Sequence, residues 1–392
     1  MDLQLSNRVQ SIKPSPTLAV TNRAAELRAA GQDIIGLGAG EPDFDTPEHI
    51  KDAAKKAMDE GFTKYTAVDG TPGLKAAVIA KFKNDNGLNY EANQILVSCG
   101  GKQSFFNMSL ALLNPGDEVV IPAPYWVSYP DMVKIAEGVP VIIETDAQAR
   151  FKITPEQLDN AITDKTRLVV LNSPSNPSGM AYSKAEFEAL GDVLRKYPNV
   201  LIATDDMYEH ILWTEEPFNN ILTVNPDLYD RTIVLNGVSK AYSMTGWRIG
   251  YAAGPQTLIG AMKKIQSQST SSPTSIAQVA AQAALEGDQQ CVKDMVTVFK
   301  KRHDFMVSAL NDIDGIECEH GDGTFYLFPS FKGAQEKLGC ETDTELAEKL
   351  LEAGVALVPG SAFGTPGHMR ISFATSDSNL EQSIERLKKA LG

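Results

Sequence analysis

Short runs rich in β-branched residues alternate with longer helical segments between residues 94 and 236. The intervening segments have the apolar spacing of amphipathic helices, and several open near Pro and close at Gly. This alternation is typical of a doubly wound, mostly parallel sheet with helices on both faces. We therefore predict an α/β fold with strands at 94–98, 118–122, 139–144, 167–172, 200–205 and 232–236.

The pattern changes after about Gly287. A long helical segment over 291–312 is followed by short strand patterns at 324–330, 355–360 and 368–374, and by a closing helix. This order suggests a smaller α+β domain, joined by the N-terminal segment. We predict a large α/β domain at 48–287 and a small domain formed by 1–47 and 288–392.

Composition excludes several classes of function. The formal net charge is -14, which disfavours binding to nucleic acid or to anionic lipid. The N-terminal residues lack the apolar core of a signal peptide, and no apolar run has the length of a membrane span. The four cysteines are scattered without CxxC spacing, so we expect neither disulfides nor a metal site. A cytoplasmic location fits these features best.

Polar and small residues follow several of the predicted strands. Asp205 ends one strand and Tyr208 comes shortly after it, while Asn176 lies in the turn beyond another. The segment after 232–236 carries Ser239, Lys240 and Arg248. Because ligands bind at the carboxyl ends of such strands, we expect these side chains to meet in one crevice.

Glycines open the helix that follows the first strand of the sheet. Gly100 and Gly101 would leave free backbone N–H groups at a positive helix end, which suits a phosphate. Ser239 and Arg248 would add a hydroxyl and a bidentate cation. A lysine for covalent attachment, an aspartate for a ring nitrogen and a phosphate site together describe pyridoxal phosphate.

The segment SKAYSMTGWRIGY, from Ser239, resembles the cofactor-attachment segment of class I aminotransferases. Other landmarks of that family follow its order along most of the chain, which makes the resemblance specific. They are GEPDF from Gly40, KYT with Tyr65, GGKQ from Gly100, PYWVSYP with Trp126, SPSNPSG with Asn176, TDDMYEH with Asp205 and Tyr208, and MRISF with Arg370. The chain looks closest to bacterial aspartate aminotransferases, some of which also accept prephenate.

The resemblance implies a cofactor role for each of these side chains. It gives Lys240 covalent attachment and proton transfer, and Asp205 the ring nitrogen. It gives Tyr208 and Asn176 the phenolic oxygen of the ring, and Trp126 a stacking position on the ring face. The phosphate would be held by Gly101, Lys102, Ser239 and Arg248, and by Tyr65 from the other subunit of a homodimer with shared active sites.

The resemblance also implies the substrates, which are amino acids and 2-oxo acids. Arg370 would bind the substrate α-carboxylate, beside Gly40, Trp126 and Asn176. Lys102 would bind the distal carboxylate of an acidic substrate, and Lys13 would help to admit prephenate. The implied reaction transfers the amino group of L-aspartate to 2-oxoglutarate, which gives oxaloacetate and L-glutamate.

The same residues are also compatible with other functions. On the same scaffold the chain could act on aromatic or neutral amino acids, or work as a β-lyase with the same cofactor. It could also be a regulator that binds the cofactor without turnover, although the presence of Lys240, Asp205 and Arg370 argues against this. Taken singly, Trp126 could be a core residue and Tyr65 a packing residue.

Overall fold

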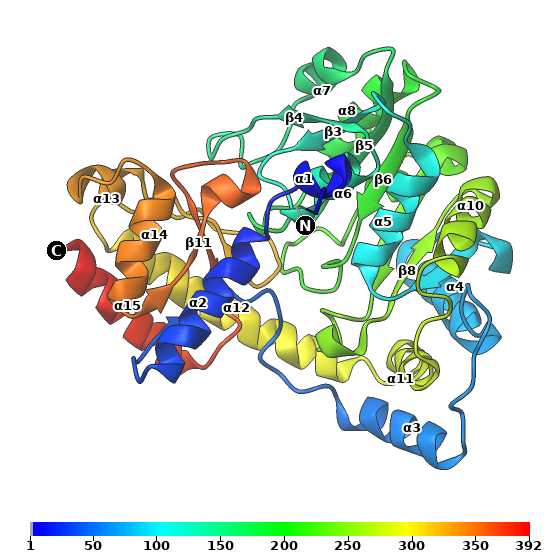
Figure 1. Ribbon diagram of the computed structural model, residues 1–392, viewed down its shortest axis with the longest axis horizontal. Helices are drawn as coiled ribbons and strands as arrows, with labels where there is room; N and C mark the ends of the chain where they lie inside the picture. Colours follow the sequence, from blue (N-terminus) through cyan, green and yellow to red (C-terminus); the bar gives the residue numbers. More distant parts are fainter. Residues whose placement is uncertain (1–2) are drawn as a thin grey trace.

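A seven-stranded sheet forms the centre of the computed structural model, which describes residues 3–392 (Figure 1). The strand order is β2-β8-β7-β6-β5-β3-β4, and the α/β prediction is confirmed. The part of the sheet from β7 through β6, β5 and β3 to β4 is parallel throughout. The bounds are β2 (Ile95–Ser98), β3 (Glu118–Pro122), β4 (Val139–Ile143), β5 (Thr166–Asn172), β6 (Leu201–Asp205), β7 (Thr232–Gly237) and β8 (Gly250–Ala253).

Side chains alternate between the two faces of this sheet, and different helices cover each face. Val170 and Ala203 pack with residues of α5, α6 and α10, whereas Val169 and Ile202 pack with α7, α8 and α9 on the opposite face. Beside the latter group, α3, α4 and α11 cover strands β2, β7 and β8. These helices are α3 (Glu48–Asp59), α4 (Pro72–Asn86), α5 (Gly101–Leu112), α6 (Ser128–Ile135), α7 (Pro155–Ala161), α8 (Lys184–Arg195), α9 (Ile221–Val224), α10 (Gln256–Ser267) and α11 (Ser275–Glu286).

Strand β8 was not among the predicted strands. It is antiparallel to both of its neighbours, β2 and β7, and its four residues are all buried. Gly250 shows why the position is specialised, since a Cβ there would lie 2.2 Å from the backbone nitrogen of Gly101. The strand thus brings its backbone directly against the start of α5.

Two small sheets lie in the rest of the chain. Strand β1 pairs in parallel with β10, and β12 lies between β11 and β9 in an antiparallel sheet. The bounds are β1 (Ile35–Gly36), β9 (Tyr326–Leu327), β10 (Val355–Ala356), β11 (Val358–Pro359) and β12 (Met369–Ser372). The helices are α1 (Asn7–Gln10), α2 (Pro16–Ala29), α12 (Gln290–Asn311), α13 (Lys332–Lys337), α14 (Asp343–Glu352) and α15 (Asp377–Leu391).

The strand predicted at 355–360 is in fact two strands that belong to different sheets. The chain passes from β10 to β11 at the buried Leu357, and each half finds its own partner. Four short 3-10 helices complete the elements of residues 3–392. They are η1 (Ala92–Gln94), η2 (Pro226–Arg231), η3 (Thr245–Trp247) and η4 (Gly360–Phe363).

The N-terminal segment lies among the C-terminal elements. Helix α2 packs through Ala24 in a small apolar cluster with Leu351 of α14 and Ala356 of β10 (Figure 1). Ile35 and Leu37 share a larger apolar cluster with residues of α12, α14 and α15. The same cluster includes Tyr208 and Ile211, which follow strand β6 of the central sheet. We keep the division into 48–287, and 1–47 with 288–392, as a proposal. Among the described residues, no helix combines the length and apolar character needed to cross a membrane.

Candidate active site

A pocket of about 330 Å³ opens at the carboxyl ends of β5, β6 and β7. Arg370 of β12 and Gly40 close it from the side of the smaller sheets. All of the predicted site residues line it except Tyr65 and Lys13. The predicted residues that line the pocket are Gly40, Gly101, Lys102, Trp126, Asn176, Asp205, Tyr208, Ser239, Lys240, Arg248 and Arg370.

Lys240 projects into this pocket just beyond the end of β7. Its Nζ donates a hydrogen bond to the carbonyl oxygen of Gly40 and lies 5.8 Å from the centre of the Phe325 ring. Burial lowers the pKa of Lys240 to about 8, and the positive charge of Arg370 acts in the same direction. A lysine whose amine is partly neutral near physiological pH can act as a nucleophile or a base.

Asp205 ends β6 and points into the pocket. Tyr129 donates its hydroxyl hydrogen to Asp205 Oδ2 at 2.5 Å, and the backbone N–H of Met207 donates to Oδ1 at 3.3 Å. Burial raises the pKa of Asp205, while the hydrogen bonds from Tyr129 and Met207 and the charge of Lys240 lower it. A cationic nitrogen placed beside this carboxylate would therefore compensate for its burial.

The start of α5 forms a cradle with Arg248. Gly100 has a φ of +89°, and a Cβ there would lie 2.2 Å from Arg248 Nη2, so only glycine leaves the guanidinium room. Arg248 is held by the carbonyl oxygens of Thr245 at 2.8 Å and Cys99 at 3.4 Å. Ser239 is buried nearby. Free helix N–H groups, a hydroxyl and an arginine suit a phosphate group, as the sequence predicted.

Arg370 is fixed on β12 as a second anion site. Its Nη1 donates to Asn176 Oδ1 at 3.0 Å and its Nη2 donates to the Gly38 carbonyl at 2.7 Å. The guanidinium lies against the rings of Tyr326 and Phe363. Its Nε is buried without a hydrogen-bond partner among the described residues. Such a donor is costly unless a ligand supplies an acceptor, and a carboxylate would do so.

Lys102, the second residue of α5, lies beside Trp126 in the lining of the pocket. Lys102 Nζ is 5.1 Å from the centre of the Trp126 ring, within the range of a cation–π contact. Trp126 in turn meets Tyr129 edge-on, with ring centres 5.1 Å apart. Burial lowers the pKa of Lys102, and the charge of Arg248 lowers it further.

Two predicted residues lie away from this pocket. Tyr65 is 95% exposed, so its expected contact with a phosphate in the other subunit stays a prediction. Lys13 lines an adjacent hollow of about 500 Å³ that it shares with Lys102 and Arg248. Its expected role with prephenate is likewise a prediction.

Several lining residues were not predicted from the sequence. Tyr129 lies in the motif that contains Trp126, but nothing in the motif marks it as the partner of Asp205. Tyr326 donates to or accepts from Tyr208 across 3.0 Å, and it was placed in a strand without a role. The N-terminal residues of α2 also reach the pocket. The missed residues include Ser15, Thr17, Leu18, Glu41, Tyr129, Asn172, Thr245 and Tyr326.

Comparison with known proteins gives this geometry its context. Residues 32–387 match the sequence model of the family described as aminotransferase class I and II. The chain is 60% identical to the aspartate/prephenate aminotransferase of Nitrosomonas europaea, covering 99% of this chain and 100% of that one. It is 51% identical to the aspartate aminotransferase of Geobacillus stearothermophilus, with 99% and 98% covered.

Solved structures agree with the sequence comparison. The aspartate aminotransferase of Rhizobium meliloti superimposes with a TM-score of 0.96 at 50% identity, covering 99% of both chains. That of Thermus thermophilus, solved with maleate, gives a TM-score of 0.93 at 42% identity, with 99% and 100% covered. The chain therefore belongs to the class I and II aminotransferases, enzymes that use pyridoxal 5'-phosphate.

Proposed function

We propose that this aminotransferase moves the amino group of L-aspartate to 2-oxoglutarate, giving oxaloacetate and L-glutamate. The single observation that carries this proposal is an excess of free cations around the pocket, in a chain with a net charge of -14. Within residues 3–392, none of the four cations that line the pocket forms an ion pair with a carboxylate. They are Lys102, Lys240, Arg248 and Arg370.

The chemistry of the ligands accounts for these cations. When bound, pyridoxal phosphate supplies the electron sink for the charge that develops at the amino acid's α-carbon. Arg248 would hold its phosphate, and Lys240 would attach it and move the proton at the α-carbon. Arg370 would hold the α-carboxylate. Lys102 then remains for a second substrate carboxylate, which neutral amino acids lack and aspartate has.

The remaining ring contacts would be made by groups at the strand ends. Asp205 would hold the ring nitrogen, with Tyr129 fixing its carboxylate. Tyr208 and Asn176 would donate hydrogen bonds to the phenolic oxygen, and Trp126 would cover one face of the ring. Each of these side chains lines the pocket, which supports the assignment.

We further infer that the enzyme is a cytoplasmic homodimer with shared active sites. A tyrosine that is 95% exposed, Tyr65, supports a contact with a second subunit. All four cysteines are free thiols, which supports a reducing compartment.

Prephenate is a second substrate that we propose for the same pocket. It carries a second carboxylate and a larger ring-derived body than aspartate. The hollow beside the pocket offers space, and Lys13 at its edge offers an additional cation. Two relatives that are 60% and 54% identical to this chain bear the name aspartate/prephenate aminotransferase, which supports the proposal.

The test is a single-turnover reaction with a panel of amino donors. The purified enzyme, loaded with pyridoxal phosphate, is mixed with L-aspartate, L-glutamate, L-alanine or L-phenylalanine, and the visible cofactor band is followed. We expect rapid bleaching with the two acidic donors, recovery of the band with 2-oxoglutarate, and a slower, measurable recovery with prephenate. Faster bleaching by phenylalanine or alanine would favour an aromatic or neutral aminotransferase. A β-lyase would release pyruvate and ammonia only from a donor with a leaving group on its β-carbon, so L-cystathionine is added to the panel for that outcome. An unchanged band with every donor would indicate a passive binder.

A further inference from the structure

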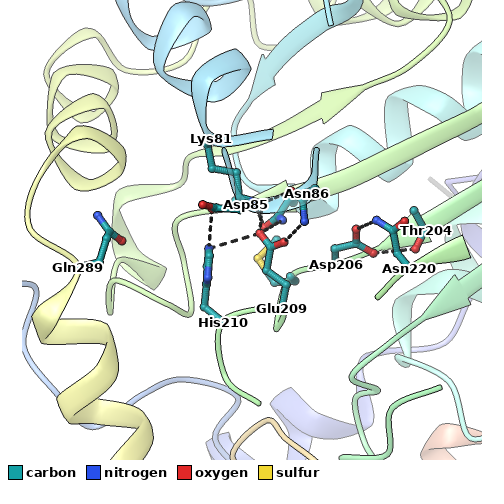
Figure 2. Close-up of polar contacts among 12 residues, drawn as sticks. Lys81, Asp85, Asn86, Thr204, Asp206, Glu209, His210, Asn220 and Gln289 are labelled. Carbon is teal, nitrogen blue, oxygen red and sulfur yellow. Dashed lines mark hydrogen bonds and ion pairs between the residues drawn. The ribbon is translucent and has the colours of Figure 1, made fainter. Parts of the chain in front are cut away.

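A buried polar cluster lies behind the pocket, formed by Lys81, Asn86, Glu209 and Asn236; we call it the Glu209 cluster. Lys81 and Glu209 form an ion pair in which each side chain is only 3% exposed (Figure 2). Asn86 Nδ2 donates to Glu209 Oε2 at 2.9 Å, and Asn236 Nδ2 donates to Glu209 Oε1 at 2.7 Å. None of the four residues lines the pocket.

The Glu209 cluster joins the two chain segments that carry the reactive groups. Glu209 directly follows Tyr208 in the turn that begins at Asp205. Asn236 lies in β7, just before the segment that carries Lys240, and its Oδ1 accepts a hydrogen bond from the Gly237 backbone at 2.7 Å. A single carboxylate therefore holds the Asp205 turn against the strand that leads to Lys240.

Helix α4 provides the third attachment of this carboxylate. Lys81 lies in its last turns and Asn86 is its last residue, and Lys81 Nζ also donates to Asn86 Oδ1 at 2.7 Å. Outside the ion pair, His210 Nε2 lies 3.4 Å from Glu209 Oε1 and 3.7 Å from Asp85 Oδ2. Figure 2 marks both contacts with dashed lines. Burial opposes ionisation of Glu209, but the charges of Lys81 and His210 and the hydrogen bonds from Lys81 and Asn86 together outweigh it and hold the pKa of Glu209 at about 2.

The neighbouring acid, Asp206, belongs to a different set of contacts. Its carboxyl group accepts from Thr204 at 2.6 Å and from Asn220 at 2.5 Å, on the side away from Lys81 (Figure 2). Burial, together with the charge of Glu209, raises the pKa of Asp206 to about 8. Glu209 is therefore the ionised member of these two buried acids at neutral pH.

Stability alone gives little reason for this ion pair. Two charges taken out of water lose their hydration, and a well-packed apolar pair of similar volume is often as stable. A buried pair does fix geometry, because only one arrangement satisfies all of its hydrogen bonds. Reacting groups need such support, since displacement by about 1 Å can reduce a rate on the order of a hundredfold.

We propose that Glu209, fixed by Lys81, is a positioning residue that sets the Asp205–Tyr208 turn relative to Lys240. It acts through Asn236 and touches neither substrate nor cofactor. The proposal rests on the proposed function, because it assumes that Asp205, Tyr208 and Lys240 act together on one bound cofactor.

The test compares Glu209→Gln, Lys81→Met and the double variant with a matched control. Lys75→Met is the control, because Lys75 is also on α4 and is 8% exposed in an ion pair with Asp69 at 2.6 Å. Four quantities are measured on the holoenzyme: the Tm, the pH midpoint of the visible cofactor band without substrate, and kcat and KM for aspartate. The midpoint reports the surroundings of the cofactor independently of turnover.

For Glu209→Gln and Lys81→Met we expect kcat to fall roughly 10- to 100-fold, with KM within about threefold of wild type. The pH midpoint should shift by about half a unit or more, because the groups around the cofactor have moved. The double variant should be no worse than the more impaired single variant, since the two residues act as one unit. Lys75→Met should lower only the Tm.

Asn236→Ala keeps the test decisive if removal of either charge prevents folding. It leaves the Lys81–Glu209 ion pair in place and removes the hydrogen bond from Asn236 to Glu209, together with the one from the Gly237 backbone to Asn236, so kcat and the midpoint should still change. Wild-type values of both in Asn236→Ala or Glu209→Gln, or equal changes in Lys75→Met, would overturn the proposal. A wild-type enzyme without a cofactor band or transamination would instead overturn the proposed function.

Discussion

Tyr129 and Asp205 are joined by a 2.5 Å hydrogen bond between the tyrosine hydroxyl and Oδ2 of the aspartate. The two residues come from different elements, since Tyr129 is on helix α6 and Asp205 ends strand β6. Burial and the nearby carboxylate raise the pKa of Tyr129 well above its ordinary value, so it stays a donor at all working pH values. The hydrogen bond thereby fixes the position of the Asp205 carboxylate and favours its ionised form.

Replacement of Tyr129 by Phe should weaken the enzyme without unfolding it. The ring would still fill its site beside Phe105, but Asp205 would lose a hydrogen bond to its charged form, and its pKa would rise. Hydrogen bonds to charged groups contribute about 1.5–3 kcal/mol, so we expect kcat to fall roughly 10- to 100-fold. Steady-state kinetics and the cofactor Kd measure this effect. Tyr182→Phe, which removes a buried hydroxyl that accepts a hydrogen bond from the Ile153 backbone, is the control and should leave kcat unchanged.

The lowered pKa of Lys240 predicts how the apoenzyme takes up its cofactor. Only the neutral amine can attack, so the rate of covalent uptake should rise about tenfold per pH unit below pH 8 and level off above it. Stopped-flow absorbance between pH 7 and 9.5 measures this rate. Lys240→Ala should bind the cofactor without the covalent band and show no turnover. A rate that continues to rise up to pH 9.5 would mean that the amine has an ordinary pKa.

The same shift has a consequence for the stability of the apoenzyme. Because the folded-state pKa of Lys240 lies below the unfolded value of about 10.4, the unfolded chain binds more protons between those values. Stability should therefore rise as the pH increases from about 8 towards 10 relative to Lys240→Met, which lacks the group. Urea unfolding of both apoproteins at several pH values measures the difference. A wild-type curve parallel to that of the variant would contradict the shift.

Much of the central sheet was predictable because its information is local. Runs such as Leu168–Leu171 are β-branched or apolar and are bounded by turns, and they form strands as expected. The candidate site residues were predicted in the same way, because Asp205 ends a strand and Lys240 comes shortly after one. Parallel strand ends meet at one edge of a sheet, so the convergence of these residues followed from their positions in the chain.

Long-range contacts were not predictable from the sequence. Nothing near Tyr129 indicates that its partner is Asp205, and nothing near Leu357 indicates that the chain changes sheets there. Strand β8 was missed because it is short and because its first residue, Gly250, usually signals a turn. The reason for that glycine is the backbone of Gly101, which lies far away in the sequence.

Gly250→Ala should therefore impair cofactor binding. Its Cβ would lie 2.2 Å from Gly101 N and 2.5 Å from the Gly100 carbonyl carbon, so the start of α5 would have to move. Overpacking of this kind costs about 1–3 kcal/mol, and the same displacement should raise the Kd for pyridoxal phosphate.

Gly260→Ala is the matched control, because its Cβ meets nothing within 4 Å and it lies inside α10. That variant should be more stable by about 0.5–1 kcal/mol, with an unchanged Kd. Tm measurements and cofactor titrations compare the two, and equal behaviour would exclude a special role for Gly250.

Lys102 should determine the preference for acidic substrates. Arg370 can pair with only one carboxylate, and a second carboxylate left unpaired in a partly buried pocket is strongly disfavoured. Among residues 3–392 Lys102 forms no ion pair, and its ammonium group lies 5.1 Å from the centre of the Trp126 ring in the lining of the same pocket. Loss of one partner of a desolvated charge pair costs about 2–5 kcal/mol, which is a loss of roughly thirtyfold or more in kcat/KM.

Lys102→Ala should show that loss with aspartate and glutamate, and a much smaller one with alanine and phenylalanine. Lys264→Ala, which removes an exposed lysine of α10, is the control. Equal losses for acidic and neutral substrates would show that Lys102 serves the phosphate alone.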